Sequence, residues 1–264
     1  MGAKHINSEW KNGALSFTTT AKNIETLTLI AKKTGCGNAD LIRSMWTPSP
    51  EIATIYFNDF APCGNTSTTA YPGFTVTIAT AGTLVAQDEA GGVLGLVGGG
   101  GDNSRMEMQS TAGFVTIASG KDLWFETRVK FTDTDQSDAF VGLSAVNTTL
   151  TKTITTAGKG EMIGFYLVDG ASKLYFVCSS GTATPVALSN KIQDDTYYRL
   201  AFYFDSNSHT HAYIDDTEVT IPVTVSSALA EIPKLALRLS LAHNTGEAQA
   251  NKMHVDYVKI IQLR

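Results

Sequence analysis

Charged residues, cysteines and long apolar runs are all scarce in this chain of 264 residues. Charged side chains make up 17% of the sequence and hydrophobic ones 43%, a balance that excludes wholesale disorder. No window approaches about 18 consecutive apolar residues, so we expect no membrane-spanning helix. The net charge of −5 argues against a dedicated nucleic-acid-binding protein.

The cysteines and the first residues indicate where the chain folds. Cys36, Cys63 and Cys178 are odd in number and widely spaced, which predicts buried reduced thiols and neither a disulfide framework nor a zinc site. The opening residues MGAKHINSEWKNG contain no apolar stretch typical of a secretion signal. We therefore expect the protein to fold in a cytoplasm.

The residues that the sequence has in abundance favour β structure. There are 34 threonines and 23 glycines. Threonine and the other β-branched and aromatic residues suit a pleated, half-buried surface, while glycine supplies turns and bulges. Long amphipathic helices are nearly absent, and an all-β sandwich of this length can still be a single domain.

Charge and proline divide the chain near residue 50. Residues 1–50 carry six Lys and Arg against three acidic groups, a charge of +3, and residues 51–264 carry a charge of −8. Pro48 and Pro50 impose extended backbone at the boundary. We interpret 1–50 as a basic N-terminal arm or small subdomain, and 51–264 as the body.

The arm contains three expected elements. Alternating apolar residues predict strands at 14–20 and 25–31, and a capping Asn38 predicts a short helix at 39–46. A piece this small buries little surface alone, so we expect it to pack on something else.

The body alternates between strand and turn patterns. Asp169-Gly170 predicts a hairpin, and Asp215-Asp216 predicts another tight reversal. The run 123–131 predicts a strand with Phe125 on the core face and Trp124 and Glu126 on a charged, solvated face. We expect strands in two sheets at 52–57, 73–78, 82–87, 105–109, 123–131, 140–145, 161–168, 173–179, 197–205, 209–214, 234–241 and 253–262.

Five stretches of the body carry a family resemblance. They are Tyr56–Phe60, Lys121–Phe131, Thr196–Asp205, Ala212–Asp216 and Met253–Ile260. Their order resembles the concanavalin A-like and laminin-G-like jelly-roll superfamily. The resemblance implies an all-β, concanavalin A-like jelly-roll β-sandwich in which the closing strand pairs beside the first. This superfamily includes glycanases, lectins and structural modules, so it does not specify a function.

A second resemblance is narrower. A jelly roll rich in Thr, Gly and Ala with a basic arm is similar to virion proteins of tailed bacteriophages, notably capsid decoration (cement) proteins. It implies a non-enzymatic structural protein on the capsid surface, made in the host cytoplasm, that stabilises the shell. Its partners would be the major capsid protein and sister copies in an oligomer, with no nucleic acid and no membrane.

The arm holds the candidate partner-binding residues, which are Trp10, Leu27, Leu29 and Trp46. The two tryptophans either pack on the body or anchor the arm on a neighbouring subunit, where aromatic residues dominate interface energetics. A strand such as 25–31 can add to an exposed sheet edge and so join neighbouring capsomers.

No catalytic pattern stands out. Sugar-cleaving enzymes need two carboxylates that face each other across a groove, and no Glu-x-Asp-x-x-Glu pattern occurs. Arg105-Met-Glu107 resembles the Arg-x-Glu strand of jelly-roll alginate lyases, but the companion motifs of those enzymes are missing. We expect no enzyme. One alternative is a carbohydrate-binding module on a virion or tail for host attachment, which stacks sugars on Tyr71, Tyr175 or Tyr213. A glycan hydrolase or lyase is the less favoured alternative.

We expect no cofactor and no metal site. His209 and His211 share one strand face but have no obvious third ligand, so we expect them to be solvated. Aspartates at 132–138 can supply oxygens for calcium, but we interpret this segment as a solvated turn. The Gly91–Gly101 tract lacks the Lys-Ser/Thr of a phosphate loop, and we interpret it as a flexible loop or a bulged edge strand.

Overall fold

The computed structural model describes residues 9–11, 14–16, 53–60, 70–87, 92–118, 120–147, 149–151, 160–171, 173–181, 186–205, 209–222, 237–246 and 252–264. The chain divides into two compact units, Met1–Ala53 and Thr54–Arg264. In the first unit, β1 (Glu9–Lys11) pairs antiparallel with β2 (Ala14–Ser16). The strand predicted at 25–31 and the helix predicted at 39–46 lie outside the described residues.

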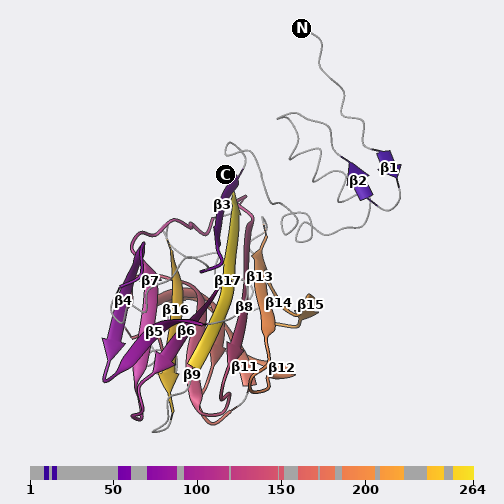
Figure 1. Ribbon diagram of the computed structural model, residues 1–264. Helices are drawn as coiled ribbons and strands as arrows, with labels where there is room; N and C mark the ends of the chain where they lie inside the picture. Colours follow the sequence, from indigo (N-terminus) through magenta and orange to yellow (C-terminus); the bar gives the residue numbers. More distant parts are fainter. Residues whose placement is uncertain are drawn as a thin grey trace. The chain divides into compact units, whose positions relative to one another are not determined.

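One layer of the second unit is a seven-stranded sheet, drawn in Figure 1. Each hydrogen-bonded pair within it is antiparallel. Its strands, in order across the sheet, are β12 (Val186–Lys191), β11 (Lys173–Gly181), β10 (Gly160–Leu167), β9 (Ser137–Ser144), β16 (Arg238–Thr245), β7 (Arg105–Ser110) and β4 (Phe74–Ala79).

The other layer is an eight-stranded sheet. Its strands, in order, are β15 (Thr217–Val219), β14 (Thr210–Ile214), β13 (Tyr198–Phe204), β8 (Leu123–Phe131), β17 (Lys252–Leu263), β6 (Val93–Gly98) and β5 (Gly82–Gln87). The eighth strand, β3 (Ala53–Asn58), pairs with β17 beside this path. The predicted pairing of the closing strand with the first strand of the body is therefore confirmed.

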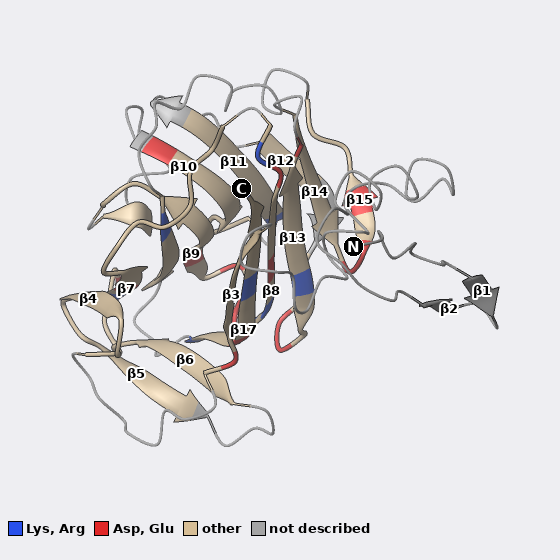
Figure 2. Ribbon diagram, turned by 90° about the horizontal axis from the view of Figure 1, so that it is seen from above, with Lys and Arg blue, Asp and Glu red and all other residues tan. Residues whose placement is uncertain are grey.

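The core lies between the two sheets and is built from alternate residues of their strands. On β8, Phe125 and Val129 are fully buried, and Phe125 stacks on Phe202 of β13 with ring centroids 4.8 Å apart. Burying a side chain of this size contributes about 1.5–3 kcal/mol, so pairs of this kind dominate the cohesion of the sandwich. Figure 2 colours Lys, Arg, Asp and Glu, and most of the ribbon in the two sheets of the sandwich is tan, as the low charged fraction leads one to expect.

Two predicted turns are confirmed by backbone geometry. Gly170 has a φ of +77° in the turn between β10 and β11, a conformation that glycine adopts without strain. Asp215 and Asp216 have φ values of 47° and 68° between β14 and β15. Aspartate tolerates this left-handed region better than most residues, which explains a two-residue reversal without glycine.

The glycine-rich tract corrects a prediction. Its central part forms β6, which lies between β17 and β5 in the interior of the sheet and is neither a loop nor an edge strand. A Cβ on Gly98 would lie 2.2 Å from Cγ2 of Thr245 on β16, so the missing side chain permits a close approach of the two sheets. The glycines therefore do not indicate a flexible loop. Gly98 is needed because a side chain at this position would collide with Thr245 on the facing sheet.

Two further features concern the cysteines and membrane-spanning helices. Cys178 is a buried cysteine, whereas Cys36 and Cys63 lie outside the described residues. Among the residues that the structure describes, no helix is long and apolar enough to cross a membrane.

Candidate functional site

The face of the seven-stranded sheet that points away from the core, called the outer face below, carries a row of polar residues on β7. Met106 and Met108 point into the core, so Arg105, Glu107 and Gln109 alternate onto the outer face. Arg105 Nε lies 3.1 Å from Glu107 Oε1, and the two side chains are only 9% and 1% exposed. Arg105 and Glu107 are the two residues whose spacing resembles the Arg-x-Glu strand of jelly-roll alginate lyases.

Burial controls the ionisation of Glu107. Desolvation raises the pKa of the Glu107 carboxyl from 4.5 to about 7, and the Arg105 charge and the backbone N–H groups of Thr151 and Leu150 oppose the increase only in part. A buried charge is costly even when it is paired, because water solvates both ions better than they solvate each other.

The described segments 145–147 and 149–151 contribute to this burial by lying on the outer face, and we call them together the strap. Leu150 is fully buried in a small apolar cluster with Phe140, Met162, Tyr166, Val177 and Ala242. Gln109 holds the start of the strap, since its Nε2 donates to the carbonyl of Ala145 and its Oε1 accepts from the amide of Asn147. The hydroxyl of Tyr166 donates to the carbonyl of Thr151.

Asp138, another acid of the outer face, is held by neighbouring donors. One Asp138 oxygen accepts from the amide of Asp169 at 3.0 Å and lies 3.3 Å from the hydroxyl of Tyr166, which shares its single proton between this oxygen and the carbonyl of Thr151. The other Asp138 oxygen accepts from Asn244 Nδ2. Burial and the Asp138 charge raise the pKa of Tyr166 above its ordinary value, so the phenol stays a donor. Glu107 and Asp138 therefore both make structural contacts in this described region, and the strap covers Glu107.

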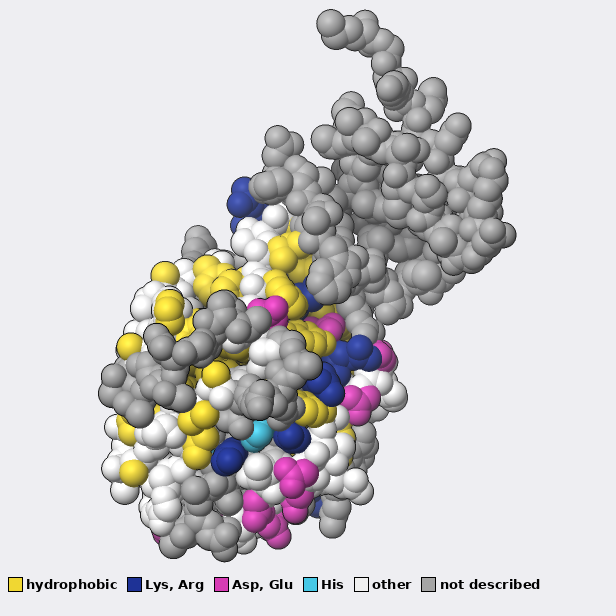
Figure 3. All heavy atoms as spheres, viewed as in Figure 1, with side chains coloured by type: hydrophobic (Ala, Val, Ile, Leu, Met, Phe, Trp, Pro, Cys, Tyr) yellow, Lys and Arg dark blue, Asp and Glu magenta, His cyan; other side chains and the backbone are white. Residues whose placement is uncertain are grey.

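On the opposite side of the molecule, the structure corrects the prediction that Trp124 and Glu126 lie on a solvated face of β8. Trp124 and Glu126 are both buried, and Trp124 Nε1 donates to Glu126 Oε2 at 3.1 Å. Tyr257 donates its hydroxyl to the other Glu126 oxygen at 2.6 Å, and burial, with that bond, raises the tyrosine pKa. Further along β8, Arg128 pairs with Asp256. Figure 3 shows basic and acidic side chains intermixed on this side.

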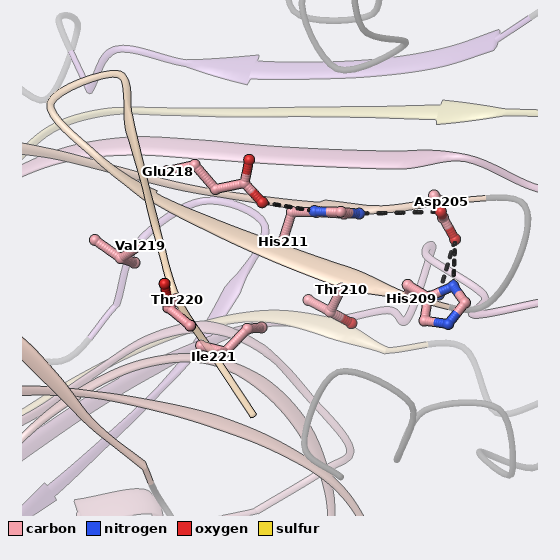
Figure 4. Close-up of a pocket in the computed structure, with 8 residues that line it drawn as sticks. All are labelled: Asp205, His209, Thr210, His211, Glu218, Val219, Thr220 and Ile221. Carbon is pink, nitrogen blue, oxygen red and sulfur yellow. Dashed lines mark hydrogen bonds and ion pairs between the residues drawn. The ribbon is translucent and has the colours of Figure 1, made fainter. Parts of the chain in front are cut away.

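The structure also has a groove at the edge of the eight-stranded sheet, with a volume of about 510 Å³. We call it the β14–β15 groove. Its lining residues, drawn in Figure 4, are Asp205, His209, Thr210, His211, Glu218, Val219, Thr220 and Ile221. The last β14–β15 pair in register is Ala212 with Val219, so the chain beyond Val219 runs outside that ladder and leaves room for the groove.

Acidic and imidazole groups meet inside this groove. His211 Nδ1 lies 2.7 Å from Glu218 Oε1, and on the other side of the ring Nε2 lies 3.9 Å from Asp205 Oδ2. Figure 4 shows the imidazole between the two carboxylates. His209 is half exposed, with Nδ1 3.7 Å from Asp205 Oδ1. Thr210 is only 2% exposed, and its hydroxyl has no hydrogen-bond partner among the described residues.

The remaining candidates from the sequence are placed as follows. Trp10 lies on β1 opposite Leu15 of β2, whereas Leu27, Leu29 and Trp46 lie outside the described residues. Their predicted role in binding partners stays a prediction. Tyr71, Tyr175 and Tyr213 are each half-buried, and Tyr71 packs edge-on against the rings of Phe60 and Phe74. In the described parts of the chain, no three His, Cys, Asp or Glu residues are grouped so as to hold a metal ion.

Sequence reasoning singled out His209 and His211 but missed the carboxylates that accompany them. A signal was present, because the predicted reversal at 215–216 makes Glu218 a diagonal neighbour of His211 across the hairpin. Asp205 directly follows β13, the strand that pairs with β14 on the side away from β15. The groove itself depends on where β15 ends, which no local pattern predicts.

Comparison with known proteins shows the fold. No family model and no curated protein sequence matches the chain. A protein of unknown function from Shewanella oneidensis MR-1 is similar in structure, with a TM-score of 0.51, 11% identity, and coverage of 94% of this chain and 97% of its own. Peanut lectin has a TM-score of 0.53 and 10% identity over 80% of this chain and 98% of its own.

A third structure was reported in a study of endo-acting O-glycanases of the human gut microbiota. It has a TM-score of 0.53 and 13% identity over 79% of this chain and 99% of its own. At such low identity these similarities show the fold alone, and the predicted all-β, concanavalin A-like jelly-roll sandwich is confirmed. Nothing in them supports a capsid decoration protein, and that role stays a prediction.

Proposed function

We propose that this chain is a non-catalytic glycan-binding module whose site is the β14–β15 groove. The observation that carries the proposal is the groove itself, whose lining includes two carboxylates, two imidazoles and apolar side chains. The shared fold with a lectin and with a structure from a glycanase study supports it.

The chemistry of the lining suits a sugar. A pyranose presents several hydroxyl groups in fixed directions, and carboxylate and imidazole groups are strong acceptors for them. Val219 and Ile221 supply apolar surface for the C–H groups of the ring. A volume of about 510 Å³ falls within the range of small-molecule sites and has room for a mono- or disaccharide.

The arrangement of acids argues against glycoside hydrolysis. A glycosidase places the scissile bond between two carboxyl groups. In the groove, the ring of His211 fills the space between Asp205 and Glu218, so no sugar linkage can lie there. On the outer face of the other sheet, Glu107 is buried under the strap and paired with Arg105. Binding without cleavage is therefore the function that we propose.

A glycan array probed with the full chain tests the proposal. We expect hits that disappear when the groove is filled by Ile221→Trp. The matched control is Val146→Trp, since Val146 is 67% exposed and lies on the strap, and this variant should keep the hits. An array without hits would overturn the proposed function, and hits that survive Ile221→Trp would overturn the assignment of the groove. Release of new reducing ends from a bound glycan would overturn the absence of catalysis.

A further inference from the structure

The strand β4 forms one edge of the seven-stranded sheet, and Figure 1 draws it at the left of the sandwich. On one side β4 pairs with β7, and on the other side no described strand pairs with it. An unpaired edge presents a row of backbone N–H and C=O groups to any chain that can add a strand. The edge of β4 is therefore a candidate surface for strand addition.

The ladder with β7 determines which backbone groups of β4 point outward. The amide of Thr111 donates to the carbonyl of Gly73 at 2.9 Å, one position before the first pair of the β4–β7 ladder. Hydrogen-bonded pairs recur at every second residue of an antiparallel ladder, so the odd-numbered residues of β4 bond β7. The even-numbered Val76 and Ile78 direct their amide and carbonyl groups to the open edge, where no described residue bonds them.

The usual protection of an exposed edge is missing from this part of the chain. Residues 70–87, which contain β4, the turn after it and β5, include no charged side chain. β4 pairs with β7 without a register shift, so it has no bulge. Charge and bulges are devices by which sheet edges avoid pairing with other chains. The side chains of Val76 and Ile78 pack against the core but are only partly buried, so a strand added here would cover them further.

We propose that β4 pairs antiparallel with β4 of a second copy of this chain, about a two-fold axis at Val76. The order of side chains favours a second copy as the partner, because Phe74-Thr75-Val76-Thr77-Ile78 has the same pattern from either end. In this register Val76 faces itself, and Phe74 faces Ile78. Thr75 of each copy faces Thr77 of the other. Pairs of these types stabilise antiparallel strands, and no like charges meet.

The outward backbone groups fit the same register. Val76 of each copy exchanges N–H···O bonds with Val76 of the other, and the amide of Ile78 reaches the carbonyl of Phe74. The amide of Phe74 takes no part, because it already donates to the carbonyl of Tyr71 at 3.0 Å. A two-fold interface uses the same surface on both copies and is closed, so association ends at a dimer.

The strand order leaves the β14–β15 groove open in such a dimer. β15 and β5 lie at opposite ends of the strand order of the eight-stranded sheet, and β5 follows β4 after a short turn. The pairing does not depend on glycan binding, but a dimer would present two grooves and would bind a repetitive glycan with higher avidity. A strand of six residues spans about 20 Å, so the contact is small and we expect a weak dimer.

Sedimentation equilibrium of the full chain from about 5 to about 500 µM, a range chosen for a small interface, tests the inference. The average mass should rise with concentration from that of one chain toward that of two, and not beyond. Hydrogen exchange of the wild-type chain gives a second measurement. The amides of Val76 and Ile78 should exchange more slowly as the concentration rises, whereas those of β15, an edge strand of the other sheet, should not change.

Two double variants test the register. Thr75→Lys with Thr77→Lys places like charges opposite each other in a closely spaced pair, and should weaken the dimer at least about tenfold. Thr75→Glu with Thr77→Lys places opposite charges there and should keep the dimer. The two proteins share the change at Thr77, whose neighbour on β7 is Glu107, and differ at the exposed position 75 alone.

Each outcome decides the proposal. A wild-type chain that stays monomeric over the whole range would overturn it. A dimer of unchanged strength in the variant with two lysine substitutions would place the interface elsewhere. Loss of the dimer in both variants would show that β4 does not pair with itself in this register. Should either variant fold poorly, unchanged exchange at Val76 and Ile78 while the wild-type mass doubles would overturn the pairing.

Discussion

Arg105 and Glu107 form a buried ion pair across one residue of β7, with 3.1 Å between Nε and Oε1. Both belong to the outer face of the seven-stranded sheet, and the strap covers the acid. The sequence pattern that resembles a lyase motif therefore produces a structural pair. In many proteins, moving two ions out of water costs more free energy than their mutual attraction recovers. The raised pKa of Glu107 follows from this imbalance.

Glu107→Gln should remove a pH-dependent loss of stability. Because the pKa of Glu107 rises from its ordinary value of 4.5 to about 7 in the folded chain, the unfolded chain releases this proton first as pH increases. The stabilisation that protonated Glu107 contributes below pH 4.5 is therefore lost as the pH rises from 4.5 to 7. The loss is about 1.4 kcal/mol per pH unit and about 3 kcal/mol in all. Urea unfolding near pH 5 and near pH 8 measures it. A variant with the wild-type pH dependence would contradict this account.

His243 should act in the opposite direction. It is fully buried, and desolvation, with a smaller effect from the His254 charge, lowers its pKa from 6.5 to about 3. As pH falls below 6.5 the unfolded chain gains a proton that the folded chain refuses, so stability declines by about 1.4 kcal/mol per pH unit down to pH 3. His243→Gln, which can keep the 3.2 Å contact with the hydroxyl of Ser137, should lose this decline.

The two effects overlap between pH 4.5 and 6.5, where their slopes have opposite signs. Each single variant should therefore expose the slope of the other residue in that window, and the double variant should show neither. Unfolding free energies of the four proteins at several pH values check this cycle. Parallel curves for all four would show that neither residue governs the pH dependence.

The fold was predictable because its signals are local, and the sites were less so because theirs are not. The alternation in 123–131 predicts β8 and its core face with Phe125 correctly. The same alternation cannot show that Trp124 and Glu126 are buried on the other face, where Tyr257 arrives from a strand more than a hundred residues later. Burial on the outward face of a sheet depends on tertiary contacts, and a period of two residues carries no information about them.

The candidate groove illustrates the same limit. His209 and His211 were recognisable as a pair on one strand face, and the pair is found in the groove. The β14–β15 groove exists because the chain leaves the ladder with β14 after Val219. Its negative charge comes from Asp205 and Glu218, which lie on two neighbouring segments. Strand ends are the least predictable feature of a sequence, so a groove formed by one is found only in the structure.

The strap should depend on a single apolar anchor. Leu150→Ala removes a fully buried side chain from the cluster around Phe140 and Tyr166, and such truncations cost about 2–5 kcal/mol. We expect faster hydrogen exchange at the amide of Asn147, which is bonded to Gln109 within the strap. Val146→Ala on the same segment is the control and should change stability by less than about 0.5 kcal/mol, since Val146 is exposed. Unchanged exchange in Leu150→Ala would show that the polar contacts alone hold the strap.

Gly98→Ala should destabilise the sandwich, and Thr245→Ser should rescue it. The new Cβ would meet Cγ2 of Thr245 at 2.2 Å, and overpacking of this kind costs about 1–3 kcal/mol. Serine lacks that methyl group but keeps the hydroxyl that donates to the carbonyl of Gly101 and accepts from the amide of Ser104. The double variant should therefore be more stable than Gly98→Ala alone, although Thr245→Ser by itself loses a buried methyl group. Thermal unfolding of the four proteins gives the coupling energy. Additive effects would mean that the strand accommodates a side chain at Gly98 by another movement, and that the glycine is not required for the close approach of β6 to β16.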